Sequence, residues 1–173
     1  VFHHGGTLDK FIGDAIMAFW NAPTDDADHA VHAVACALDM VETLARFNAS
    51  NAASGIDLDI GTGLHTGPAV VGFVGSQRKL EYTAIGDTVN LGSRLEGETK
   101  GRTRILVSAA TRDACGDAFR FTDFGTVTVK GRQASVQVFA PAKPGASAEA
   151  AARAVAAIAA EIVAGAEIPA AGR

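Results

Sequence analysis

The sequence predicts an α+β domain in which short strands, most of them paired as hairpins, alternate with helices. Short apolar runs of strand length recur over the first 140 residues and are separated by turns rich in Gly and Pro. Longer segments instead repeat apolar residues at helical spacing. The 173 residues are 48% hydrophobic and 20% charged, which is typical of a globular chain with one core.

The first predicted element is a hairpin over residues 7–12 and 15–21, joined by the two-residue turn Gly13-Asp14. A helix is predicted from about Asp28 to Asn48, because acidic residues favour a helix start and "NASNAASG" reads as a turn-rich end. The helix carries its apolar residues at Val31, Val34, Leu38, Val41 and Ala45.

A second strand pair is predicted at Leu58–His65 and Ala69–Gly75, with Thr66-Gly67-Pro68 as its turn. A short strand around Glu81–Ala84 follows. The stretch "DTVNLGSRLEGETK" predicts a helix that Asp87 caps.

The rest of the domain is predicted as the strand "RILVS", the short helix "AATRDACGD" and two closing strands across Lys130-Gly131. We assign residues 1–140 to one domain and residues 141–173 to a Pro/Gly/Ser linker with an Ala-rich helical tail. The tail fits either a partner helix or a loosely docked segment. The chain opens without Met and close to its first strand, so we expect it to begin inside a domain.

Charge and cysteine content narrow the functional classes. The net charge is −4 and the charges are interspersed, so we expect no nucleic-acid polymer as a partner. Cys36 and Cys115 belong to no metal-binding pattern and are expected to fill apolar space as reduced thiols, which fits a cytoplasmic setting. No apolar stretch reaches the length of a membrane span.

Three separated patches place polar groups that suit a nucleotide. Lys10 and Asp14 lie on the first hairpin, and Lys130 lies at a Gly turn. Asn90 and Arg94 are four residues apart on a predicted helix and share a face, where an amide and a guanidinium suit a sugar oxygen and a phosphate. Each residue alone also fits a structural role.

Together, "DKFIGDAIMAFWNAP", "GLHTGPAVVGFVGSQRKLEYTAIGDTVNLGSRLEG" and "TVKGRQASVQVFAP" resemble the catalytic domain of class III nucleotide cyclases, most closely bacterial adenylate cyclases. The resemblance covers about residues 5 to 140. It implies a palm-type, ferredoxin-like antiparallel sheet with flanking helices. It also implies conversion of a nucleoside triphosphate, here ATP, into a 3′,5′-cyclic nucleotide and pyrophosphate, with two divalent ions, Mg²⁺ or Mn²⁺, held by two aspartates.

The resemblance assigns a role to each candidate residue. Asp14 aligns with the second metal aspartate, Arg94 with the arginine at the transition-state α-phosphate, and Asn90 with the asparagine that orients the ribose. Lys130 aligns with a triphosphate-binding lysine. Lys10 and Thr83 align with the pair that reads the base, and a Thr in this place resembles the subclass that includes bicarbonate-responsive cyclases.

Two further expectations follow from the resemblance. The family's first metal aspartate lies on a strand that would precede Val1, so we expect the first strand and helix of the fold to be missing from this chain. Active sites of the family form between two head-to-tail protomers, so we expect a homodimer, with an upstream sensor or membrane domain in the full-length protein.

Three functions other than that of an adenylate cyclase are considered. A guanylate cyclase, or one relaxed in base choice, would share the same chemistry. A non-catalytic cyclase-homology module would bind a nucleotide or partner only, but such a module has no need of Asp14, Asn90, Arg94 and Lys130 together. The diguanylate cyclases are disfavoured because their Gly-Gly-Asp/Glu-Glu-Phe turn is absent from the sequence.

Overall fold

The computed structural model describes residues 1–128 and 135–145. Its helices and strands confirm the α+β class. In chain order they are the 3₁₀ turn η1 (Phe2–His4), β1 (Thr7–Ile12), β2 (Ala15–Phe19), α1 (His29–Asn51), the 3₁₀ turn η2 (Ala52–Ser54), β3 (Thr62–Leu64), β4 (Val70–Ser76), β5 (Lys79–Ile85), α2 (Asp87–Gly97), β6 (Ile105–Ser108), α3 (Ala109–Cys115), β7 (Arg120–Val127) and β8 (Val136–Ala142).

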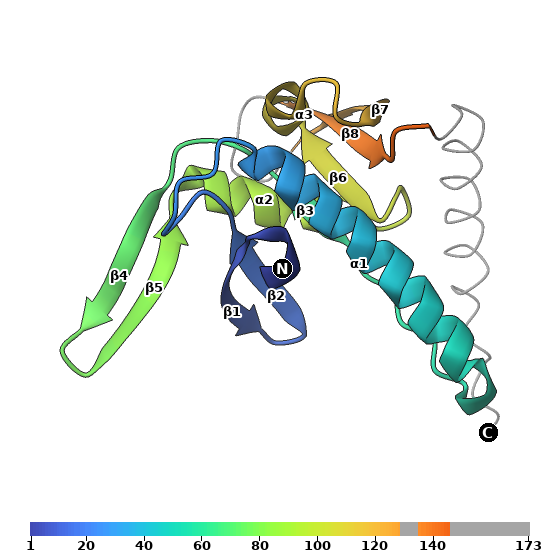
Figure 1. The fold of residues 1–173 in the computed structure, drawn as a ribbon, viewed down its shortest axis with the longest axis horizontal. Coiled ribbons are helices and arrows are strands. Elements are labelled where there is room, and N and C mark those ends of the chain that lie inside the picture. Colours follow the sequence, from blue (N-terminus) through green and yellow to red (C-terminus); the bar gives the residue numbers. More distant parts are fainter. Residues whose placement is uncertain (129–134, 146–173) are drawn as a thin grey trace.

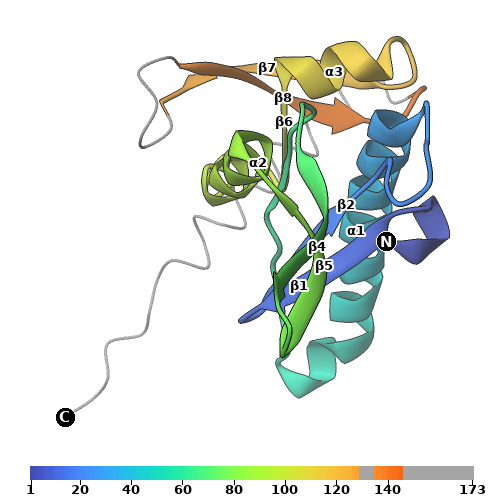
Figure 2. The same cartoon turned by 90° about the vertical axis from the view of Figure 1, so that its left-hand side faces the viewer.

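The core is a four-stranded sheet in the order β3-β6-β8-β7. Strand β3 pairs with β6 in parallel, and the other two pairs are antiparallel. Helices α1 and α3 cover one face and α2 covers the other, as Figures 1 and 2 show from two sides. Because side chains alternate along a strand, Ile105 and Val107 of β6 pack with α1 while Leu106 packs with α2.

Two hairpins extend from this core (Figure 1). Strands β1 and β2 pair through the predicted two-residue turn, where Gly13 has a φ of 65°. A positive φ suits glycine, which has no Cβ to clash with the backbone. Strands β4 and β5 pair over their whole length, from Val70 opposite Ile85 to Ser76 opposite Lys79.

The predicted second strand pair is wrong in its pairing. Strand β3 bonds to β6 and strand β4 bonds to β5, so the segments on either side of Thr66-Gly67-Pro68 do not pair with each other. The reason is that β3 lies at the edge of the four-stranded sheet, where β6 supplies its backbone hydrogen bonds, while β4 has a nearer partner two residues beyond its own end.

Two predicted helix boundaries are also wrong. Helix α1 continues three residues past Asn48, because Ser50 and Asn51 bond back to carbonyls one turn earlier, and the αL residue Gly55 ends the segment after η2. Gly86, and not Asp87, is the N-cap of α2. Asp87 is the first residue of the helix, so its carboxylate lies in the first turn, where the helix dipole favours it.

The predicted state of the two cysteines is confirmed. Cys36 and Cys115 are buried and unpaired, and burial raises the pKa of the Cys115 thiol to about 11. Within residues 1–128 and 135–145, no helix has both the length and the apolar character needed to span a membrane. Strands β7 and β8 pair as expected, but Lys130 in their connection and the tail from residue 146 lie outside the described residues.

Helix α2 lies unusually close to strand β3 at Gly63. A Cβ placed there would lie 2.2 Å from the backbone nitrogen of Glu96 and 2.3 Å from the backbone oxygen of Gly92. These are main-chain atoms of the helix, so they cannot rotate away as a side chain would. The absence of a side chain at Gly63 therefore sets the distance between α2 and the sheet.

We expect Gly63→Ala to destabilise the domain by about 2 kcal/mol or more, since overpacking a tight contact typically costs 1–3 kcal/mol. The measurement is the midpoint of denaturant-induced unfolding. Gly97→Ala is the matched control. Gly97 lies in α2, the helix that Gly63 contacts, and a Cβ at Gly97 meets no atom within 4 Å. An equal midpoint for the two variants would contradict the close approach.

Candidate functional site

Strands β1 and β5 bring the two predicted base-reading residues into one cluster. The Lys10 Nζ lies 2.8 Å from Glu81 Oε2, and the Thr83 hydroxyl donates to Asp9 Oδ2 at 2.5 Å. Lys10 Nζ also lies 3.6 Å from the other oxygen of Asp9. The structure thus places Lys10 and Thr83 together, linked through the two carboxylates.

The ion pairs of this cluster shift the pKa values of its members. The hydrogen bond from Lys10, followed by one from Lys79, lowers the pKa of Glu81 from 4.5 to about 2. The same bond from Glu81 raises the pKa of Lys10, against the opposing effect of desolvation. Both groups are therefore held in their charged forms through the physiological range.

Asp14 lies exposed in the turn of the β1–β2 hairpin. Within the described residues its carboxylate has no hydrogen-bond or ion-pair partner. Both of its oxygens are available to a ligand from outside the chain.

Helix α2 carries the predicted catalytic pair. Asn90 is exposed and Arg94 is partly buried, and their spacing of one turn puts them on the same side of the helix. Leu91 and Leu95, on the side toward the core, are 1% and 0% exposed. In the part of the chain that the structure describes, neither the Asn90 amide nor the Arg94 guanidinium has a side-chain partner, so both keep their donors available.

The structure does not bring all candidate residues to one place within the chain. The turn between β1 and β2 lies at the end of that hairpin remote from α2 in both views (Figures 1 and 2). Asp14 therefore does not meet Asn90 or Arg94 within one chain. The position of Lys130 falls outside the described residues.

Residues 1–128 and 135–145 do not by themselves form a metal centre. They contain no cluster of three or more His, Cys, Asp or Glu side chains that could hold an ion. Asp14 fits a divalent cation as a single exposed carboxylate, which is the hard oxygen ligand that Mg²⁺ and Mn²⁺ favour. A complete site needs ligands from elsewhere.

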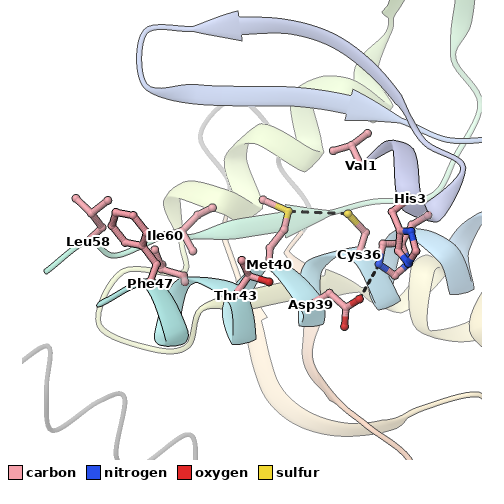
Figure 3. A pocket seen from close by; sticks show the side chains of 11 residues that line it. Val1, His3, Cys36, Asp39, Met40, Thr43, Phe47, Leu58 and Ile60 are labelled. Atoms are coloured by element: carbon pink, nitrogen blue, oxygen red, sulfur yellow. Dashed lines mark hydrogen bonds and ion pairs between the residues drawn. The ribbon is translucent and has the colours of Figure 1, made fainter. Parts of the chain in front are cut away.

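One apolar hollow of about 490 Å³ lies away from these residues. It is lined by η1, α1 and the segment before β3, and Figure 3 shows Cys36 and Met40 of α1 side by side in it. At its edge His4 Nε2 lies 2.8 Å from Asp39 Oδ2. None of the candidate residues lines this hollow, so the hollow is separate from the candidate site.

Sequence reasoning missed two members of the cluster, Asp9 and Glu81. A signal for Asp9 was present, because two adjacent charges, Asp9 and Lys10, stand in the middle of a strand whose neighbours are apolar. An alternating pattern would place one of them on the buried face, where an unpaired charge is costly. Glu81 carried no comparable signal.

Comparison with known proteins places this geometry in context. The family model of the "Adenylate and Guanylate cyclase catalytic domain" matches residues 6–141. Adenylate cyclase 1 of Rhizobium meliloti (strain 1021) is 46% identical over 138 residues, which cover 79% of this chain and 21% of that protein. The chain therefore spans about a fifth of the length of this relative.

Two solved structures have closely similar folds. The crystal structure of the guanylyl cyclase Cya2 matches with a TM-score of 0.75 and 37% identity, over 83% of this chain and 73% of that one. The adenylyl cyclase CyaB from P. aeruginosa matches with a TM-score of 0.75 and 34% identity, over 82% of this chain and 74% of that one. Fold similarity alone therefore does not separate the two substrates.

The charge cluster predicts an acid-shifted Glu81. We expect its carboxyl group, followed by NMR during a pH titration, to titrate near pH 2. Because this pKa is lowered on folding, the stability that Glu81 contributes is present above pH 4.5 and is lost as the pH falls toward 2.

Lys10→Met should raise the Glu81 pKa more than the matched change Lys79→Met, because the Lys10 bond is the larger cause. A Glu81 titration near 4.5 in the unchanged protein would show that the pair does not form.

Proposed function

The chain belongs to the adenylate and guanylate cyclase catalytic domain family, and on that premise we propose that it is the catalytic domain of an adenylate cyclase, which converts ATP into 3′,5′-cyclic AMP and pyrophosphate. The observation that carries the proposal is the cluster on β1 and β5, which joins Lys10 and Thr83 in a chain that is 46% identical to an adenylate cyclase. The product is a cyclic nucleotide, so the role is in signal transduction. The two unpaired cysteines agree with a reducing compartment such as the cytoplasm.

The reaction is an internal phosphoryl transfer. The ribose 3′-oxygen attacks the α-phosphorus, the bond from that phosphorus to the bridging oxygen breaks, and pyrophosphate leaves as the 3′-hydroxyl loses its proton. Negative charge builds on the phosphate oxygens, so cationic donors that are already in place lower the barrier.

Helix α2 supplies donors suited to this charge. We assign Arg94 to the α-phosphate and Asn90 to the ribose. The absence of partners for both side chains within the described residues supports this assignment, because donors that are already engaged would first have to break a bond. The predicted role of Lys130 on the triphosphate remains part of the proposal.

Asp14 is proposed as the ligand that this chain provides for divalent cations, Mg²⁺ or Mn²⁺. Such ions, when bound, would stabilise the charge of the triphosphate and favour the deprotonated 3′-oxygen. The hairpin turn leaves the carboxylate exposed and without a partner in residues 1–128 and 135–145, so its oxygens are open to a metal ion. The family resemblance implies one more metal aspartate beside Asp14.

A head-to-tail homodimer would complete the site. Asp14 and the α2 pair are separated within one chain, so two copies are needed for them to face each other. Both hairpins expose large apolar side chains that a partner could cover. The exposed set is Phe11, Ile12, Ile16, Val70, Phe73, Val74, Leu80 and Ile85.

Base choice favours adenine in this proposal. The Lys10 ammonium has three donors, so it can keep its bond to Glu81 and still donate to a ring nitrogen of the base. The Thr83 hydroxyl can accept from the 6-amino group. GTP as substrate is the second candidate, since the guanylyl cyclase Cya2 matches with the same TM-score as an adenylyl cyclase.

The direct test is an assay of the full-length protein for cyclic AMP with ATP and Mn²⁺ or Mg²⁺. We expect production that Asp14→Ala abolishes while the circular dichroism spectrum is unchanged. Asp25→Ala, another exposed aspartate in a loop, is the matched control and should keep activity. Near-normal product from Asp14→Ala would refute the metal assignment.

The shared site predicts complementation. Arg94→Ala should lower kcat by roughly a hundredfold, about 3 kcal/mol, with a smaller effect on KM, because the contact forms mainly in the transition state. Mixing inactive Arg94→Ala and Asp14→Ala chains should restore part of the activity, since one site of each mixed dimer is intact. Mixed dimers that form but show no recovery at any ratio would exclude the shared-site arrangement.

A further inference from the structure

Asp9 is a buried carboxylate that the proposed reaction does not use. Its side chain is 1% exposed, which is rare for an aspartate unless donors surround it. Here the Thr83 hydroxyl donates to Oδ2 at 2.5 Å, and the backbone nitrogen of Ala84 reaches the same oxygen at 3.4 Å. The other oxygen faces the Lys10 ammonium at 3.6 Å and has no hydrogen bond among the described residues.

A β-bulge explains why Asp9 reaches this cluster. Leu8 pairs with Ala18 and Lys10 pairs with Met17, so β1 has one more residue than β2 at this point, and that residue is Asp9. In a regular strand, Asp9 and Lys10 would point to opposite faces. The bulge lets both side chains contact β5, and bulges commonly redirect a side chain beside a functional site.

The bond from Thr83 to Asp9 limits what Thr83 can do for another partner. A hydroxyl has one proton and two lone pairs, while a carboxylate has only acceptors. Because the single proton of Thr83 is directed at Asp9, only the lone pairs remain for a third group. Thr83 is then an acceptor toward anything that approaches it.

We propose that Asp9 determines base specificity as a positioning residue: by accepting the Thr83 proton, it leaves Thr83 able to receive the amino group of adenine and unable to donate to the carbonyl oxygen of guanine. This inference rests on the proposed function and adds a residue to it. A free threonine hydroxyl would rotate and serve either base. The bond to Asp9 removes that freedom, so the adenine preference depends on a residue that does not touch the nucleotide.

The test compares kcat/KM for ATP and GTP in the full-length protein and in Asp9→Asn. Asp9→Asn removes the negative charge, so the oxygen that the Ala84 backbone nitrogen and the Thr83 hydroxyl share becomes a weaker acceptor. The Thr83 proton is then held less firmly and can turn toward the base. We expect the ATP-to-GTP ratio to fall by about tenfold, which corresponds to one hydrogen bond.

Two variants at position 83 test whether Asp9 acts on base choice through the Thr83 hydroxyl. In Thr83→Val, which lacks the hydroxyl, Asp9→Asn should leave the ratio unchanged. In Thr83→Ser, which keeps it, Asp9→Asn should again lower the ratio. Asp39→Asn is the matched control, because it removes another hydrogen-bonded carboxylate outside the cluster and should not alter the ratio.

A binding measurement gives the same comparison without turnover. The 3′-deoxy forms of ATP and GTP lack the attacking hydroxyl, so their dissociation constants report the base contacts alone. The ratio of these constants should shift in the same direction as the kinetic ratio. If Asp9→Asn does not fold, Asp9→Ala takes its place and should give a fall of the same sign, because it removes the acceptor and frees the hydroxyl to rotate.

The outcomes separate this inference from the function on which it rests. If the unchanged protein turns over neither nucleotide, the proposed function is wrong. If it is active and Asp9→Asn lowers both rates equally, Asp9 only secures β1 to β5 and the inference is overturned. A change of ratio that persists in Thr83→Val would overturn it as well, since the effect would not pass through the hydroxyl.

Discussion

Strand β6 is buried on both faces, and the positions of the three helices depend on it. Ile105 and Val107 form one core with α1 and α3, and Leu106 forms the other with α2. Each side chain removed from water at these positions contributes roughly 2 kcal/mol, so the strand stabilises both layers at once. The absence of a side chain at Gly63 then lets α2 approach the sheet closely enough to close the second core.

The candidate site lies on helix α2 and on the two hairpins, all of which are attached to this core. Helix α2 has a buried side, with Leu91 and Leu95, and an outer side with Asn90 and Arg94. The two hairpins extend from this core, and backbone pairing holds the strands of each together, with one bulge at Asp9. Polar groups of the site therefore divide into two kinds. Asp9, Lys10, Glu81 and Thr83 are bonded to one another, while the side chains of Asn90, Arg94 and Asp14 have no side-chain partner among the described residues.

This division agrees with the chemistry proposed for each group. Base recognition needs donors and acceptors of fixed direction, which mutual hydrogen bonds provide. Phosphate and metal binding need groups that are open to a ligand, and the structure gives Arg94 and Asp14 no side-chain partner in the part of the chain that it describes. The exposed apolar side chains of the hairpins, Phe73 above all at 74% exposure, give a second copy of the chain a surface to cover.

The sequence by itself determined the α+β class, most helix and strand positions and the candidate residues, because apolar periodicity and turn chemistry are local and the cyclase motifs lie in continuous stretches. The β1–β2 hairpin was predictable because its turn is Gly13-Asp14. The β4–β5 turn contains no Gly, Asn or Asp, the residues that usually indicate a hairpin turn, so it was not predicted. Only the tertiary structure decided that β3 pairs with β6, that Asp9 is bulged and buried, and that Thr83 donates to it. These features depend on which donors and acceptors still lack a hydrogen-bond partner when segments distant in the sequence come together. A local sequence pattern does not contain that information.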